Sequence, residues 1–102
     1  MLFLIHCLDK QGAQALRAEN AASHAQYMRA HADRVRLGGP LLSDDGTERQ
    51  GVVVLGEFDD AQQVQRFLAQ EPYHSAGLFE RVVVHPFEVV MNGFVKEQDK
   101  TC

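Results

Sequence analysis

The segment from residue 70 to 79 carries the residues of this chain best suited to acid–base chemistry. It places a carboxylate, a proline, an aromatic ring and an imidazole in direct succession, as Glu71-Pro72-Tyr73-His74. Proline disfavours helical geometry at the residue before it and ends a preceding helix. Glu71 is therefore predicted at a helix terminus, where a carboxylate can act as a base or can cap a turn.

A second imidazole, His24, lies far upstream on a segment predicted to be helical. Its helix face also carries Asn20, Tyr27, Met28 and His31, at spacings of three and four. Because imidazole titrates near neutral pH, His24 is a candidate general acid or base, and Glu71 is a candidate for the carboxylate that orients it. Viewed singly, each also fits a structural role, as a histidine satisfied by one hydrogen bond and as a solvated helix-end charge. The sequence leaves open whether the two side chains meet.

Metal chemistry has little support in the pattern. His24 and His31 share a helix face but stand roughly 10 Å apart along the axis, which is too far to ligate one ion. The other histidines, His6, His74 and His85, have no ligand-like spacing. The glycines at 38 and 39 lack the Lys and Ser/Thr of a phosphate loop. We therefore predict neither a metal site nor a cofactor.

Length and composition describe one globular domain. The chain has 102 residues, of which 45% are apolar and 24% charged, and its net charge is −4. The acidity and the scattered Lys and Arg argue against nucleic acid or an anionic membrane as a partner. The apolar run 2–8 is too short to span a bilayer and lacks the features of a signal peptide, so we expect a cytoplasmic protein. Cys7 and Cys102 are interpreted as free thiols rather than a disulfide.

The predicted order of elements is β-α-β-β-α-β. Strands are expected at 2–8, 34–42, 51–58 and 81–91, and helices at about 20–32, within the helix-favouring stretch 12–32, and at about 60–70, capped by Asp59-Asp60. A short helical turn should follow Pro72, and Pro86 predicts an edge position or a bulge for the last strand. This order is the ferredoxin-like α+β pattern, an antiparallel sheet with two helices on one face. We expect residues 1–92 to form the domain and 93–102 to be a charged, flexible tail.

The first and third predicted strands are apolar on both faces. In the first, Leu4 and Leu8 alternate with Phe3 and Ile5. Two helices cover only one face of such a sheet, so the other face of so small a protein needs a cover. We expect a second copy of the chain, packed sheet to sheet as a homodimer.

Several of these features, in this order, resemble the YCII-related (YciI-like) family. The resemblance rests on the opening strand with Asp9-Lys10, the helical His24, Gly38-Gly39-Pro40-Leu41, Gly56-Glu57-Phe58, the segment 71–79 and Val84-His85-Pro86-Phe87. It extends from residue 1 to about 91. It implies a dimeric ferredoxin-like α+β barrel with a pocket centred on a histidine and an acid, here His24 and Glu71. Many members carry Asp at the second position, where this chain has the longer Glu.

Three functions are compatible with this sequence. The first is a small-molecule enzyme of lyase or isomerase type. In it His24 transfers the proton, Glu71 orients His24, Gly39 and Pro40 shape the pocket wall, and Tyr73 closes one side. At least one relative in the resembling family is regarded as a dehydrochlorinase of a chlorinated aromatic. The second is a non-catalytic dimeric module that binds a small molecule or a partner protein. The third is a cofactor-independent monooxygenase of the similarly built α+β barrels, for which this chain has no distinguishing residue.

Overall fold

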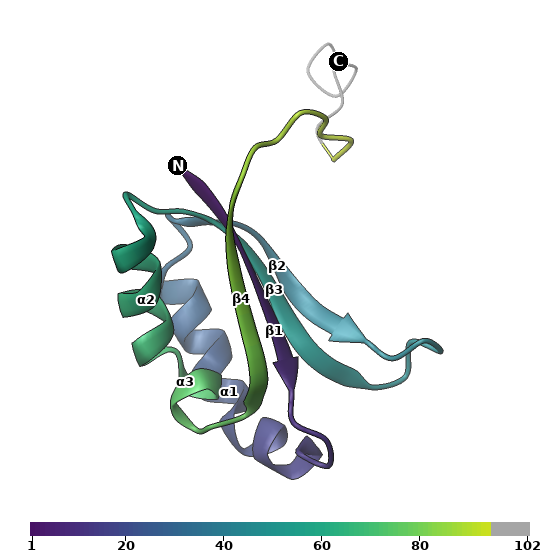
Figure 1. The fold of residues 1–102 in the computed structure, drawn as a ribbon. Helices are drawn as coiled ribbons and strands as arrows, with labels where there is room; N and C mark the ends of the chain where they lie inside the picture. Colours follow the sequence, from purple (N-terminus) through teal and green to yellow (C-terminus); the bar gives the residue numbers. More distant parts are fainter. Residues whose placement is uncertain (95–102) are drawn as a thin grey trace.

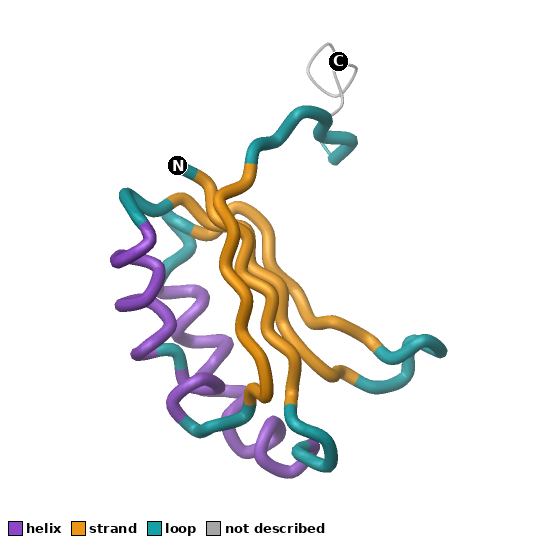
Figure 2. The backbone as a smooth tube through the Cα atoms, in the orientation of Figure 1, coloured by secondary structure: helices purple, strands orange, loops and turns teal. Residues whose placement is uncertain are grey.

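The computed structural model describes residues 1–94, and its elements follow the predicted order, including the short helix after Gln70. They are β1 (Leu2–Asp9), α1 (Gln14–Ala30), β2 (Val35–Leu42), β3 (Arg49–Glu57), α2 (Ala61–Gln70), α3 (Pro72–Ser75) and β4 (Phe79–Phe87). The strands form an antiparallel four-stranded sheet in the order β2-β3-β1-β4. The helices lie together on one face of this sheet (Figures 1 and 2). The predicted ferredoxin-like α+β fold is confirmed.

The two largest differences from the predicted boundaries are at the start of α1 and the end of β4, and each has a physical reason. The first helix begins at Gln14 and runs unbroken through Asn20, because the amide of Asn20 donates to the Leu16 carbonyl inside the helix instead of capping a new one. The last strand ends at Phe87 rather than 91, because Phe87 pairs with Leu2 and β1 offers no partner beyond that residue. Pro86 lies on this edge strand, as predicted.

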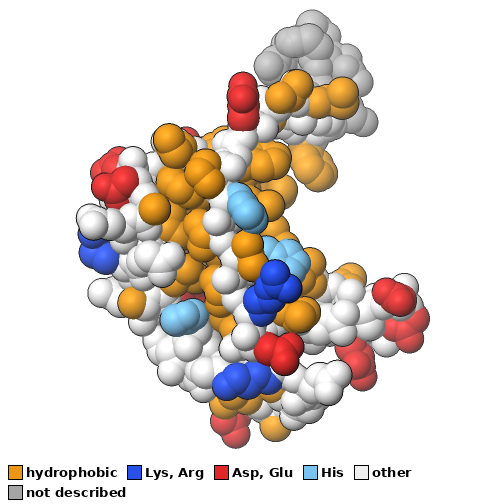
Figure 3. All heavy atoms as spheres, viewed as in Figure 1, with side chains coloured by type: hydrophobic (Ala, Val, Ile, Leu, Met, Phe, Trp, Pro, Cys, Tyr) orange, Lys and Arg blue, Asp and Glu red, His pale blue; other side chains and the backbone are white. Residues whose placement is uncertain are grey.

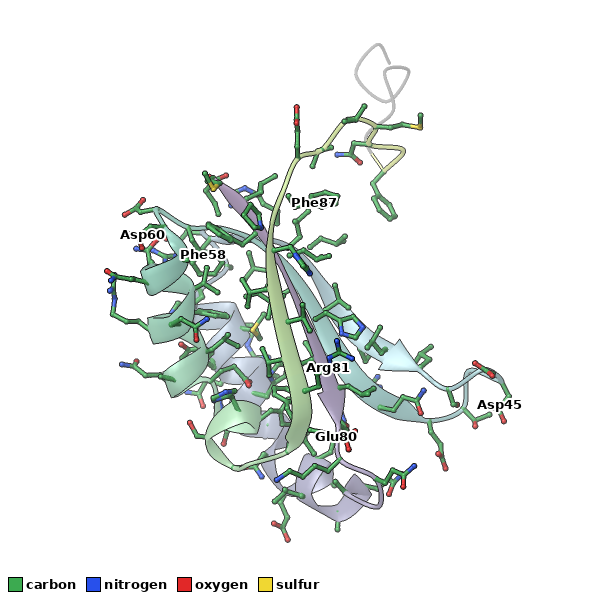
Figure 4. The ribbon with its side chains drawn as sticks, in the orientation of Figure 1. Asp45, Phe58, Asp60, Glu80, Arg81 and Phe87 are labelled. Atoms are coloured by element: carbon green, nitrogen blue, oxygen red, sulfur yellow. The ribbon has the colours of Figure 1, made fainter. Side chains whose placement is uncertain are left out.

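The core lies between the sheet and the helices. Its buried side chains come from alternate positions of β1 and β3 and from the apolar faces of the helices and their flanking turns: Phe3, Ile5, Cys7, Val52, Val54, Phe58, Val64, Phe67, Leu68, Tyr73 and Leu78. Asp60 caps α2 by accepting from the Gln63 amide, as the sequence predicted (Figure 4). This capped helix carries Val64, Phe67 and Leu68 into the core and ends at Gln70, with Glu71 as its C-cap.

The opposite face of the sheet carries no helix of the described residues. Cα partners share a face, so Leu4, Leu55 and Leu37 form one apolar row across β1, β3 and β2. Hydrophobic side chains gather on the hollow side of the curved sheet, with histidine and arginine side chains among them (Figure 3). We call this surface the open face. Within residues 1–94, no helix is long and apolar enough to cross a membrane.

Candidate active site

Glu71 occupies the junction of two helices. It is the C-cap of α2 and the N-cap of α3, and Pro72 takes the first helical position of α3. Its Oε2 accepts from the His74 amide at 3.0 Å, and only 4% of the residue is exposed. The predicted helix terminus is thus confirmed. The cap holds the carboxylate in one orientation and leaves its second oxygen for another partner.

That partner is His24, from the middle of α1. The His24 Nδ1 and the Glu71 Oε1 are joined by a hydrogen bond between residues that are 47 positions apart in sequence. An ionised carboxylate can only accept, so Nδ1 donates and the neutral ring keeps its lone pair on Nε2. Among residues 1–94, no hydrogen bond involves Nε2 of His24. Every buried side-chain nitrogen in these residues has a hydrogen-bond partner. Nε2 is therefore not fully buried and lies at accessible surface.

Tyr73 packs between the imidazole of His24 and a guanidinium group. The imidazole stacks on the Tyr73 ring at a centroid distance of 4.1 Å and an interplanar angle of 18°. The guanidinium carbon of Arg17 lies 4.8 Å from the centre of the same ring. Because the imidazole fills one face of the ring, Arg17 lies over the other. Burial raises the pKa of the Tyr73 hydroxyl, and the positive charge of Arg17 opposes that shift.

Arg17 is itself held by a buried carboxylate. Its Nε and Nη2 donate to Asp9 at 2.7 and 3.3 Å, and Nη2 also donates to the Gly51 carbonyl at 2.8 Å. The sequence pattern did not predict the pair of Arg17 and Asp9. One signal was present, because Arg17 precedes His24 by seven positions and therefore shares its helix face. No local sequence pattern indicated Asp9 as the acidic partner, because its contact with Arg17 depends on how α1 packs against β1.

Gly39 and Pro40 lie on the edge strand β2, opposite Val53 and Val52. Both are exposed. A Cβ at Gly39 would have no heavy atom within 4 Å. Their role as a pocket wall stays a prediction.

Two further groups have no direct part in this arrangement. Burial raises the pKa of the Cys7 thiol to about 12, with the charges of Glu71 and Asp9 adding to the effect, so the thiol stays protonated and unreactive. The His31 Nδ1 bonds to the Tyr27 carbonyl within α1. Residues 1–94 contain no cluster of three or more side chains that could hold a metal ion.

A cavity of about 440 Å³ lies next to this arrangement, at the end of β1. Asp9 lines this cavity and also binds Arg17, which lies over the Tyr73 ring. The Asp9–Arg17 ion pair therefore contacts both the cavity and the stacked rings. His24 and Glu71 do not line this cavity.

Comparison with known proteins agrees with this fold and with the earlier resemblance. The family model of the YCII-related domain matches residues 1–88. The chain belongs to the YCII-related family. This YCII-family chain is 29% identical over 97 residues to the protein YciI of Escherichia coli O6:H1 and to that of Shigella flexneri. Each alignment covers 88% of the chain and 99% of the relative.

A solved structure is similar over most of the chain. It is the 5-chloro-2-hydroxyhydroquinone dehydrochlorinase (TftG) of Burkholderia phenoliruptrix AC1100, in complex with 2,5-dihydroxybenzoquinone. The TM-score is 0.80 and the identity 29%, and the alignment covers 86% of this chain and 94% of TftG. A protein of this fold, 29% identical to this chain, therefore acts on a small organic molecule.

Proposed function

We propose that this YCII-family protein is a small-molecule enzyme of lyase or isomerase type in which His24 transfers a proton. One observation carries the proposal: the imidazole is fixed by Glu71 on one nitrogen and by the Tyr73 ring on one face, with the other nitrogen accessible. A base held in this way is positioned before substrate arrives. The paired carboxylate stabilises the imidazolium that forms when Nε2 takes a proton.

The similarity to TftG supports dehydrochlorination as the specific reaction. A hydroquinone that carries chlorine on its ring has a keto tautomer, in which a hydroxyl proton has moved to the carbon that bears chlorine. In the loss of HCl from this tautomer, Nε2 of His24 takes the proton of a hydroxyl that is conjugated with that carbon. The electrons of the broken O–H bond form a new C=O bond, the ring double bond shifts to the carbon that bears chlorine, and chloride leaves with the electrons of the C–Cl bond. The imidazolium then returns its proton to water. No redox partner is needed, because the proton and the chloride together account for the atoms lost.

A chloride-release assay with 5-chloro-2-hydroxyhydroquinone tests this proposal. We expect His24→Ala to lower kcat by about 10²- to 10⁴-fold, the usual contribution of a positioned acid–base group. The matched control is His74→Ala, which removes an exposed imidazole but keeps the backbone amide that donates to Glu71. Full activity of His24→Ala would contradict the proposed base. A wild-type protein that binds the compound without releasing chloride would favour the non-catalytic binding module instead.

Glu71→Gln tests the orienting role separately. The amide has nearly the same shape but no charge to stabilise the imidazolium, so kcat should fall, though by less than in His24→Ala. The ¹⁵N chemical shifts of the His24 ring report its tautomer. We expect the Nδ1-protonated form in the wild type and a mixture of tautomers in Glu71→Gln. An unchanged kcat with an unchanged tautomer would show that Glu71 serves only as a helix cap.

We also propose that the active form is a homodimer that buries the open face of the sheet. The apolar row of Leu4, Leu37 and Leu55 supports this assembly, because a domain of this size gains stability by covering such a surface.

A further inference from the structure

The cavity at the end of β1 has an unbalanced set of charges. Two cations, Lys10 and Arg49, line it together with two carboxylates, Asp9 and Glu80. Figure 4 shows Glu80 at the start of β4, close to the end of β1. The carboxylate of Asp9 is already engaged by Arg17 on both oxygens. Two cations therefore face a single uncommitted carboxylate, and the lining is net positive.

Neither cation of the lining is neutralised within the described part of the chain. No hydrogen bond or ion pair among residues 1–94 involves the side chain of Lys10 or Arg49, and Glu80 pairs with neither. The Lys10 Nζ lies 3.8 Å from the position that a Cβ of Gly77 would take, which places the ammonium beside the turn after α3. Cations that border a concave site without protein partners attract a ligand of negative charge.

A chain of side-chain contacts connects the cavity to the candidate active site. Asp9 lines the cavity and holds Arg17, which lies over the Tyr73 ring. The positive charge of Arg49 acts on the same ring, because it opposes the rise in the pKa of the Tyr73 hydroxyl. The Asp9–Arg17 ion pair thus connects the cavity to the aromatic ring on which the imidazole of His24 stacks.

We infer that this cavity binds the charged end of a small organic anion, which Arg49 and Lys10 hold by charge-assisted hydrogen bonds. A volume of about 440 Å³ is within the range of small-molecule sites and suits a compound built on a single ring. The inference goes beyond the proposed function, because His24 does not line this cavity, and it names the class of ligand: a compact carboxylate or phenolate.

Benzoate and benzamide form a matched pair of probes, because they share one ring and differ in charge. Titration followed by NMR or calorimetry should show saturable benzoate binding and much weaker benzamide binding. Arg49→Gln should weaken benzoate binding about tenfold or more, as expected for the loss of a hydrogen bond between charged groups. Lys10→Gln should weaken it too, and Glu80→Gln should strengthen it. Arg66→Gln, which removes a charge from the exposed side of α2, should have no effect.

Equal binding of the two probes, or equal benzoate affinity in Arg49→Gln and Arg66→Gln, would overturn the anion site. Failure of benzoate to bind would do the same. His24→Ala separates this inference from the proposed function, because its benzoate binding should persist. If His24→Ala keeps full turnover while Arg49→Gln loses benzoate binding, the proposed base is wrong and the anion site stands.

Discussion

Glu71 shows how one side chain can serve structure and site together. One carboxylate oxygen caps α3 and the other binds His24, so the same residue ends one helix, begins the next and orients an imidazole. Pro72 makes this possible, because it favours extended backbone at Glu71 and cannot donate a competing amide. Where many relatives are expected to carry Asp, the longer Glu still reaches His24 from this cap.

Cys7 provides a pH-dependent prediction at the same scale. Burial, followed by the charges of Glu71 and Asp9, raises the pKa of its thiol from 9.0 to about 12. Above pH 9 the thiol of the unfolded chain ionises, whereas the folded one stays protonated. The stability due to this group is therefore complete below pH 9 and is lost as the pH rises toward 12, by at most about 1.4 kcal/mol per pH unit.

Urea unfolding at several pH values between about 8 and 11 measures this loss. The wild type should lose stability more steeply with pH than Cys7→Ala, which has no thiol to ionise. Tyr27 and Tyr73 have raised pKa values as well, so some decline should remain in the variant. Identical slopes for the two proteins would show that Cys7 is not the group responsible.

At the scale of elements, the contact of α1 with the sheet depends on a few polar anchors in an otherwise apolar interface. Arg17 reaches from α1 to Asp9 at the end of β1 and to the Gly51 carbonyl of β3. Both side chains of the ion pair are largely buried, so removal of one partner would strand a charge. These bonds set the position of α1 along the strands and, two turns later, the position of His24.

At Gly51, atoms of both β1 and β2 lie close to the position that a Cβ would take on β3. A Cβ there would clash with the Cys7 carbonyl oxygen and would lie 2.7 Å from Leu41 Cδ1. Because the first obstacle is backbone, the strands must shift, and Gly51→Ala should cost about 1–3 kcal/mol of unfolding free energy.

Gly39→Ala is the control for that substitution on the neighbouring strand. The added Cβ has open space, so its effect should stay within about 0.5 kcal/mol. Urea denaturation of both variants measures their free energies of unfolding. Equal stability of Gly51→Ala and Gly39→Ala would mean that the sheet adapts at no cost. A kinetic defect in Gly39→Ala alone would support the predicted pocket role of this residue.

At the scale of the whole molecule, the chain has one face covered by helices and one that is open and largely apolar (Figures 1 and 3). Leu37, half exposed on β2, lies in the apolar row of that open face. If two copies pack sheet to sheet, each substitution in the face occurs twice in the symmetric interface.

We expect the wild type to sediment as a dimer and Leu37→Asp to shift toward the monomer, because burial of an unpaired carboxylate is costly. The dimer dissociation constant should rise about tenfold or more. Gln62→Asp places the same charge on the exposed surface of α2 and should leave the dimer intact. A wild type that stays monomeric at all concentrations would contradict the assembly, as would a Leu37→Asp dimer of unchanged affinity.

Much of this architecture is encoded in local patterns of the sequence. Alternating apolar residues identify the strands, Asp60 marks the start of α2, and Pro72 identifies Glu71 as a helix terminus. The order of these elements was enough to predict the fold, and the residues in them were enough to predict the family. Residues 95–102, most of the predicted C-terminal tail, lie outside the described structure.

Only the tertiary structure decided which side chains meet. His24 and Glu71 are 47 positions apart, and their contact depends on the rotation of α1 and its height above the sheet. The same packing brings Arg17 to Asp9 and places the Tyr73 ring between His24 and Arg17, and the sequence indicated neither of these arrangements. Local patterns determine which face of an element is apolar, because that depends on residue spacing alone. They do not determine how two elements slide against each other, because that depends on the packing of every side chain between them.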